Sequence, residues 1–93
     1  MPTLTIFEGI KINVYFGEHL PPHIHAIYNE YEVLLKIKDS EIYEGHLPSK
    51  QLRKSQYWVA ENRSDLLNAF YELNPHLKNE ERNKKHTKNN KNK

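Results

Sequence analysis

The spacing of apolar residues changes once along this chain, between residues 47 and 49. Before this point apolar and polar side chains alternate, as in residues 10–14 (I-K-I-N-V). A period of two is typical of a strand that buries one face. After Ser49 the apolar residues recur every three or four positions, which is typical of an amphipathic helix. The order of the two patterns predicts an α+β fold in which a sheet is followed by helices.

The alternating part divides into short runs that predict four or five antiparallel strands in a meander. The runs are residues 3–7, 10–16, 23–28, 32–38 and 41–47. Asn29-Glu30 and Asp39-Ser40 are short connections of the kind that join neighbouring strands. We therefore expect one antiparallel sheet in which consecutive strands pair, with Gly17 and Gly45 at turns or bulges.

Two helices are expected after the strands, packed on one face of the sheet. Ser49 is placed to cap a helix from Lys50 to about Asn62, and Ser64 to cap a second helix that ends near Pro75. The side chains of these helices that we expect in the core are Trp58, Leu66, Leu67 and Phe70.

Charge separates a folded part from a tail. Residues 1–75 hold seven Lys/Arg and ten Asp/Glu, whereas residues 76–93 hold seven Lys/Arg and two Glu. The tail has no apolar residue after Leu77, so we expect a single α+β domain over residues 1–75 and a basic tail over 76–93 that is disordered or is a frayed extension of the last helix. The tail either contacts RNA phosphates or only keeps the chain soluble.

Composition favours a cytoplasmic protein. The 93 residues include no cysteine, which excludes disulfides and thiolate metal sites and fits a reducing compartment. No segment resembles a signal peptide or the run of about 20 apolar residues that crosses a membrane. A domain this short buries only about 60% of its unfolded surface, so pairing with another chain, including a second copy, is a reasonable expectation.

The densest group of ionisable side chains lies in residues 18–26, E-H-L-P-P-H-I-H-A. Glu18 and His19 precede two prolines that restrict the backbone, and His23 and His25 follow them. Strand periodicity puts His23 and His25 on one face of the sheet, opposite the apolar residues. We therefore expect both imidazoles on an open face, away from the helices.

Acid–base catalysis is one use of such a face. Histidine transfers protons near neutral pH when a carboxylate orients it. The catalytic candidates are His23 and His25, with His19 as a further histidine and Glu18 or Glu44 as the carboxylate. This set suits a metal-free ribonuclease.

Substrate contacts are expected from neighbouring positions of the same face. The binding candidates are Tyr15, Lys36, Lys38 and His46. The two lysines supply positive charge for a phosphate group.

A divalent metal site is an alternative. His-x-His on a strand presents two imidazoles to one ion, so His23 and His25 with His19 as third ligand would form an open site. Glu18 and His46 are alternative third ligands. A third interpretation gives His23 and His25 no chemical role beyond hydrogen bonds within the sheet.

A pattern that runs from the first half of the chain into the second helix matches a known family. It comprises Val14-Tyr15-Phe16, Glu18-His19-x-Pro21-Pro22-His23-x-His25-Ala26-x-Tyr28, Glu30-Tyr31-Glu32, Gly45-x-Leu47-Pro48, Trp58 and Asp65-Leu66-Leu67. Over roughly residues 5–73 the chain resembles the small bacterial proteins catalogued as domain of unknown function 4160.

The resemblance implies a partner rather than a reaction. Many members are encoded beside a small protein catalogued as domain of unknown function 2442, an arrangement that suggests toxin–antitoxin-like pairs with an RNA-directed role. The polar residues characteristic of the family fall on His19, His23 and His25. This chain departs from the pattern at Tyr57, where an acidic residue is usual, and at Asn62, where a histidine is common.

Two functions are consistent with these observations. The first is a toxin that acts as a histidine-dependent ribonuclease. The second is a non-catalytic binding module, an antitoxin or regulatory partner, whose histidine face is an interface. The negative charge of residues 1–75 weakens long-range attraction of RNA and so argues for caution about the enzyme.

Overall fold

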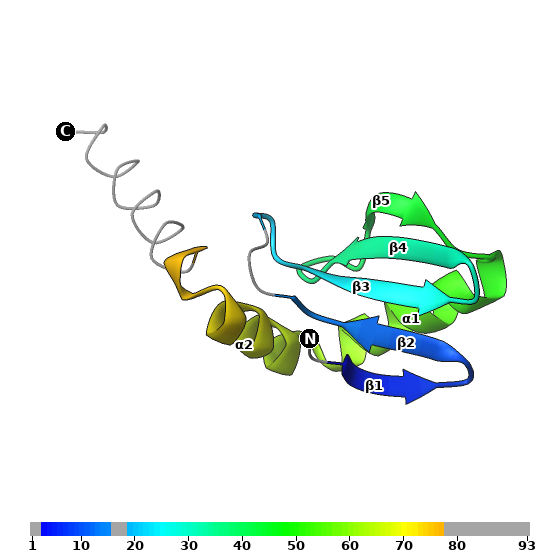
Figure 1. Ribbon diagram of the computed structural model, residues 1–93, viewed down its shortest axis with the longest axis horizontal. Helices are drawn as coiled ribbons and strands as arrows, with labels where there is room; N and C mark the ends of the chain where they lie inside the picture. The colour runs from blue at the N-terminus through cyan, green and yellow to red at the C-terminus, as the bar shows by residue number, and fades with distance from the viewer. Residues whose placement is uncertain (1–2, 16–18, 78–93) are drawn as a thin grey trace.

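The computed structural model describes residues 3–15 and 19–77, and its strands form one antiparallel sheet (Figure 1). The strands are β1 (Thr3–Phe7), β2 (Ile10–Asn13), β3 (His23–Tyr28), β4 (Tyr31–Lys36) and β5 (Ile42–His46). Their order in the sheet is β1-β2-β3-β4-β5, so every strand pairs with its neighbour in the sequence. The predicted antiparallel meander of four or five strands is confirmed, with five strands in the described part of the chain.

The turns between the strands follow the residue types that predicted them. Asn29 has a φ of 53° in the β3–β4 hairpin, and Ser40 has a φ of 64° between β4 and β5. Gly45 has a φ of 91° beside a register shift in the β4–β5 pair. A Cβ atom on Gly45 would lie 2.3 Å from the carbonyl oxygen of Glu32, so only glycine allows the two strands to approach this closely. Gly17 lies outside the described residues.

Two helices follow the sheet, α1 (Ser49–Glu61) and α2 (Arg63–Leu73). The predicted serine caps are wrong by one or two positions. Pro48 and Asn62 occupy the N-cap positions, and neither helix start has a side-chain capping hydrogen bond. The carbonyl oxygens of these two residues accept the first helical hydrogen bonds, from the amides of Leu52 and Leu66. Ser49 and Ser64 are therefore already inside the helices.

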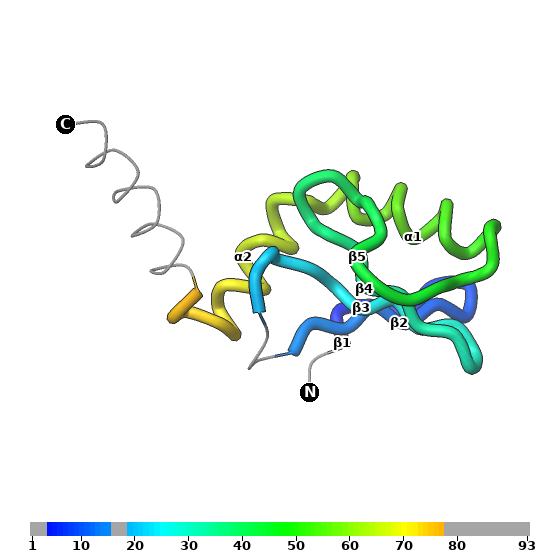
Figure 2. The backbone as a smooth tube through the Cα atoms, turned by 90° about the horizontal axis from the view of Figure 1, so that it is seen from above, coloured from blue at the N-terminus to red at the C-terminus, as the bar shows by residue number. Residues whose placement is uncertain are grey.

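The core lies between the sheet and the helices (Figure 2). Its strand residues include Ile10, Ile12, Ile24, Ala26, Val33 and Leu35, all of them fully buried. Leu66 and Phe70 of α2 are buried with them, whereas Trp58 and Leu67 are partly buried against the same cluster. Leu77 also belongs to the core with 5% of its surface exposed, so the packed part reaches the first residues of the predicted tail.

The two faces of the sheet differ in composition. Helix α1 covers one face (Figures 1 and 2), and we call the opposite face the outer face. Asn13 of β2, His25 of β3 and Leu34 of β4 are register partners, and their side chains alternate with the buried core residues. The outer face therefore carries two polar side chains, Asn13 and His25, next to each other on β2 and β3. In the described part of the chain, no helix is long and apolar enough to cross a membrane.

Candidate functional site

His23 and His25 point to the outer face of β3. Their register partners on β4 are Lys36 and Leu34, and their ring centroids lie 5.4 Å apart. The predicted alternation that places the two imidazoles on one face is therefore observed.

His23 is buried, which corrects the expectation that both imidazoles lie on an open face. Only 2% of its surface is exposed. Its ring lies 5.7 Å from that of Phe70 in α2 and 5.5 Å from that of Tyr43 in β5, measured between centroids. Helix α2 reaches the end of the sheet where β3 begins, so it covers this position although it leaves His25 partly exposed.

His25 has a carboxylate partner that the sequence interpretation missed. Its Nδ1 atom lies 2.8 Å from Oε2 of Glu32 on β4. The exposed fractions of the two side chains are 13% and 48%. Glu32 is the register partner of Ile27, one diagonal away from His25, and such diagonal neighbours are within reach in an antiparallel pair. The register set by the Asn29-Glu30 turn was the signal that could have identified Glu32.

The hydrogen bonds define which ring nitrogen is basic. Nδ1 of His23 lies 2.8 Å from the carbonyl oxygen of Pro21, and Nδ1 of His25 contacts the Glu32 carboxylate. A carbonyl oxygen and a carboxylate only accept, so both Nδ1 atoms carry the proton. In the neutral imidazoles Nε2 is then the basic nitrogen.

Two further side chains complete what we call the histidine cluster: Asn13, Tyr15, His23, His25 and Glu32. The rings of Tyr15 and His25 meet edge to face at 4.5 Å and 90°. Asn13 donates through Nδ2 to the Tyr15 hydroxyl oxygen at 2.8 Å. Asn13 is only 4% exposed, and its Oδ1 has no hydrogen-bond partner among the residues that the structure describes. A buried acceptor without a partner is uncommon and marks a place where function competes with stability.

The other predicted binding residues lie around the cluster. Lys36 is the register partner of His23, and its ammonium lies 3.9 Å from Asp39 Oδ2. Lys38 is exposed in the turn after β4. His46 pairs with Glu32 in register, but its ring packs against Tyr31 at 5.6 Å. Tyr15 and Lys36 are thus adjacent to the histidines, and His46 is directed elsewhere.

The three predicted metal ligands do not converge. His19 is exposed, and within residues 3–15 and 19–77 no group of three His, Cys, Asp or Glu side chains could hold a metal ion. His19, His23 and His25 therefore do not form such a group. Glu18, predicted both as a catalytic carboxylate and as an alternative ligand, lies outside the described residues. Its part in the site stays a prediction.

The two departures from the family pattern lie away from the cluster. Tyr57 is 69% exposed on α1, which covers the opposite face of the sheet. Asn62 joins the two helices and donates through Nδ2 to the carbonyl oxygen of Trp58. Neither substitution touches the histidine cluster.

Comparison with known proteins identifies the family and nothing finer. No curated protein and no solved structure matches the chain. The family model described as "Domain of unknown function (DUF4160)" matches residues 9–71, which span the whole histidine cluster and both helix starts. Because this match covers more than half of the chain, the protein belongs to the DUF4160 family.

Proposed function

We propose that this chain is the ribonuclease-type toxin of a toxin–antitoxin-like two-gene system, with His25 and Glu32 as its acid–base pair. The observation that carries the proposal is the 2.8 Å contact between His25 Nδ1 and Glu32 Oε2 on a partly exposed face. A carboxylate in this position fixes the tautomer of the imidazole and stabilises the imidazolium that forms when Nε2 takes a proton.

RNA suits such a site because it carries its own nucleophile. Cleavage requires a base that removes the 2′-hydroxyl proton, an acid that protonates the leaving 5′-oxygen, and positive charge near the phosphate. In this proposal His25 is the base, and Lys36 and Lys38 contact the phosphate. The basic residues of the tail add long-range attraction for RNA, which the acidic folded part lacks.

His23 supports His25 in this proposal instead of contacting RNA. Its 2% exposure leaves no room for a phosphodiester, and its ring is packed among Phe70, Tyr43 and His25. Its bond to the Pro21 carbonyl oxygen fixes its orientation, and its ring in turn limits the movement of His25. It is a positioning residue.

Cleavage by the purified full chain in the presence of EDTA tests the proposal. We expect RNA cleavage that is lost in His25→Ala and Glu32→Gln, and growth arrest on expression that the same changes relieve. His46→Ala is the matched control, because His46 is an exposed histidine whose ring contacts Tyr31. If both cluster variants cleave RNA and arrest growth as the parent chain does, the proposal fails.

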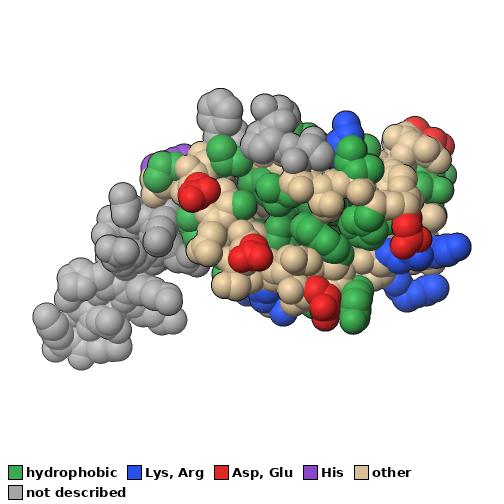
Figure 3. Space-filling view, turned by 90° about the horizontal axis from the view of Figure 1, so that it is seen from below, with side chains coloured by type: hydrophobic (Ala, Val, Ile, Leu, Met, Phe, Trp, Pro, Cys, Tyr) green, Lys and Arg blue, Asp and Glu red, His purple; other side chains and the backbone are tan. Residues whose placement is uncertain are grey.

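The edges of the sheet favour the binding module as a second candidate. Ile42 and Tyr43 of β5 are 44% and 45% exposed, and Leu4 and Ile6 of β1 are 38% and 64% exposed. Figure 3 views the molecule from the side on which β1 lies and shows hydrophobic side chains gathered on this side of the molecule. Among the residues that the structure describes, no strand pairs with the outer edge of β1 or of β5, and such an open edge can pair with another chain.

The module makes a different prediction from the enzyme. The product of the neighbouring gene should form a stable complex with this chain. Tyr43→Ser should weaken the complex more than Tyr57→Ser, which makes the same substitution on α1. Tyr43 contacts His23, so a partner bound at β5 would adjoin the histidine cluster. Failure of the two proteins to associate at micromolar concentration would remove this candidate.

A further inference from the structure

The histidine cluster holds a second group that can transfer a proton. We infer that Tyr15 is the general acid of the proposed ribonuclease and that Asn13 positions its hydroxyl. The inference rests on the proposed function and assigns a step that His23 cannot perform. A general acid must contact the leaving oxygen, and His23 is 2% exposed.

Tyr15 is partly exposed and lies directly against the proposed base. Its ring meets His25 edge to face with centroids 4.5 Å apart. It follows β2, and His25 lies on the neighbouring strand β3, so one substrate phosphate on the outer face could meet both groups. A concerted cleavage removes a proton from the 2′-hydroxyl and delivers a proton to the 5′-oxygen of one phosphodiester. The base and the acid must therefore both lie close to the same phosphate.

The hydrogen bond from Asn13 determines what the Tyr15 hydroxyl can do. Asn13 Nδ2 donates to the hydroxyl oxygen at 2.8 Å, so the O–H proton of Tyr15 is directed to another acceptor. Accepting a hydrogen bond also stabilises the phenolate that remains after the proton has left. Asn13 is thus a positioning residue.

The unpartnered atom of Asn13 supports this assignment. Asn13 is 4% exposed and its Oδ1 has no partner in the described part of the chain, a defect that costs stability. An apolar side chain of the same size would avoid the cost. An amide at this position is explained if its Nδ2 orients Tyr15.

The step balances without a co-reactant. His25 Nε2 takes the proton of the 2′-hydroxyl as the bond from the 2′-oxygen to phosphorus forms. The bond from phosphorus to the 5′-oxygen breaks, and Tyr15 gives its proton to that oxygen. The products are a 2′,3′-cyclic phosphate and a 5′-hydroxyl, and a proton passes from the imidazolium to the phenolate through solvent.

Tyr15→Phe in the full chain, assayed on two substrates, tests the assignment. On an RNA dinucleotide we expect kcat to fall about 100-fold or more with KM nearly unchanged. On a uridine 3′-(4-nitrophenyl phosphate), whose leaving group needs no protonation, we expect the variant to approach the parent rate. His25→Ala should be slow on both substrates, because both need the base.

Asn13→Asp tests the positioning role. In the parent chain Asn13 Nδ2 donates a hydrogen bond to the Tyr15 hydroxyl oxygen. An aspartate carboxylate would instead accept a hydrogen bond from the Tyr15 hydroxyl and hold its proton away from the leaving oxygen. This nearly isosteric change should therefore reproduce the substrate-dependent loss. Tyr57→Phe is the matched control for Tyr15→Phe, because it removes the same hydroxyl from an exposed tyrosine on α1, and it should leave both rates near those of the parent. If Asn13→Asp does not fold, as judged by circular dichroism, Tyr15→Phe alone decides.

Each outcome separates the inference from the proposed function. RNA cleavage that Tyr15→Phe leaves intact overturns the assignment of Tyr15 and preserves the His25–Glu32 proposal. Equal losses on both substrates show a structural role for the phenol and also overturn the assignment. Absence of cleavage by the parent chain overturns both.

Discussion

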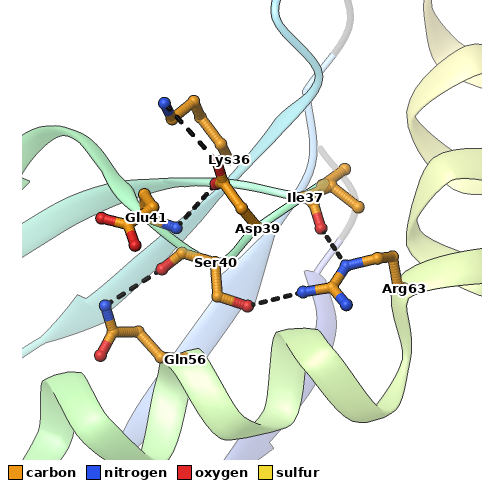
Figure 4. A network of polar contacts seen from close by, with 7 residues as sticks. All are labelled: Lys36, Ile37, Asp39, Ser40, Glu41, Gln56 and Arg63. Atoms are coloured by element: carbon orange, nitrogen blue, oxygen red, sulfur yellow. Dashed lines mark hydrogen bonds and ion pairs between the residues drawn. The ribbon is translucent and has the colours of Figure 1, made fainter.

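Two polar clusters of this molecule differ in where their hydrogen bonds go. The histidine cluster joins polar side chains of β2, β3 and β4 with Tyr15, which follows β2, on the outer face. The second group, which we call the turn cluster, lies between the β4–β5 turn and the helices (Figure 4). Its members are Lys36, Ile37, Asp39, Ser40, Glu41, Gln56 and Arg63.

The turn cluster secures backbone. Arg63 donates through Nε to the carbonyl oxygen of Ile37 and through Nη2 to Ser40 Oγ, at 3.0 Å for the latter. Gln56 donates to the carbonyl oxygen of Ser40 at 3.0 Å. Ser40 has a positive φ, so these bonds hold a strained turn against both helices.

In the histidine cluster His23 also bonds backbone, at the carbonyl oxygen of Pro21, but Asn13 and Glu32 are engaged differently. Asn13 donates to another side chain and leaves a buried oxygen without a partner among the described residues, and Glu32 bonds an imidazole instead of backbone. The comparison indicates that the turn cluster and the histidine cluster have different roles. One stabilises the fold, and the other departs from the rules of stability in the way that functional sites do.

The largest predicted effect is the loss of RNA cleavage in a histidine-cluster variant that keeps its stability. His25→Ala should lower the RNA cleavage rate about 100- to 10,000-fold, because it removes the proposed base. The free energy of unfolding, measured in urea, should change much less than for a core substitution. A loss of unfolding free energy as large as that of a core substitution would show that His25 has a structural role. The two clusters would then not differ in role.

Arg63→Ala should show the opposite pattern. It leaves the Ile37 carbonyl and the Ser40 hydroxyl without their donor, which costs about 1–3 kcal/mol of unfolding free energy. Cleavage at a temperature where the variant is folded should equal that of the parent chain. Arg53→Ala, an exposed arginine on α1, is the control, and an equal destabilisation by both changes would contradict the structural role of the turn cluster.

Asn13→Leu would sharpen the comparison within the histidine cluster. The apolar side chain removes a buried acceptor that lacks a partner, so stability should stay the same or rise by about 1 kcal/mol while cleavage falls. Urea denaturation and the cleavage rate of the same preparation measure both. A loss of more than about 2 kcal/mol would show that the amide stabilises the sheet.

The smallest effect comes from an exposed ion pair outside both clusters. The hydrogen bond and charge of Lys54, with a further contribution from Lys50, hold the pKa of Glu8 below its usual value of 4.5. A carboxyl group with a lowered pKa in the folded state stabilises above its unfolded pKa, and the contribution is lost as the pH falls through the folded value. Glu8→Gln should therefore lower Tm slightly at pH 7 and not at pH 2. A difference that persists at pH 2 would contradict the ion pair as its cause.

The fold was predictable because local patterns encode it. The core residues of β2, β3 and β4 recur with a period of two, and the turns contain residues such as Asn29 that accept a positive φ. All five residues of β5 are exposed, so this strand was located by the Asp39-Ser40 turn before it. The N-cap positions were missed because Pro48 and Asn62 accept the first helical hydrogen bonds through their backbone carbonyl oxygens. Neither N-cap has a side-chain capping hydrogen bond that a sequence pattern could have identified.

The site was predictable only in part. Alternation placed His23 and His25 together, but the burial of His23 depends on Phe70 of α2, which lies 47 residues further along the chain. The choice of Glu32 over Glu44 depends on the hairpin register and not on sequence proximity. Long-range packing therefore decided which members of the cluster face solvent.

A double-mutant cycle on His25 and Glu32 tests most directly the claim that they act as one unit. Cleavage rates of the full chain in EDTA would be compared for the parent, His25→Ala, Glu32→Gln and the double variant. Because Glu32 acts only through His25, the double variant should be no slower than His25→Ala. Multiplied losses in the double variant, or an unchanged rate in Glu32→Gln, would contradict the account.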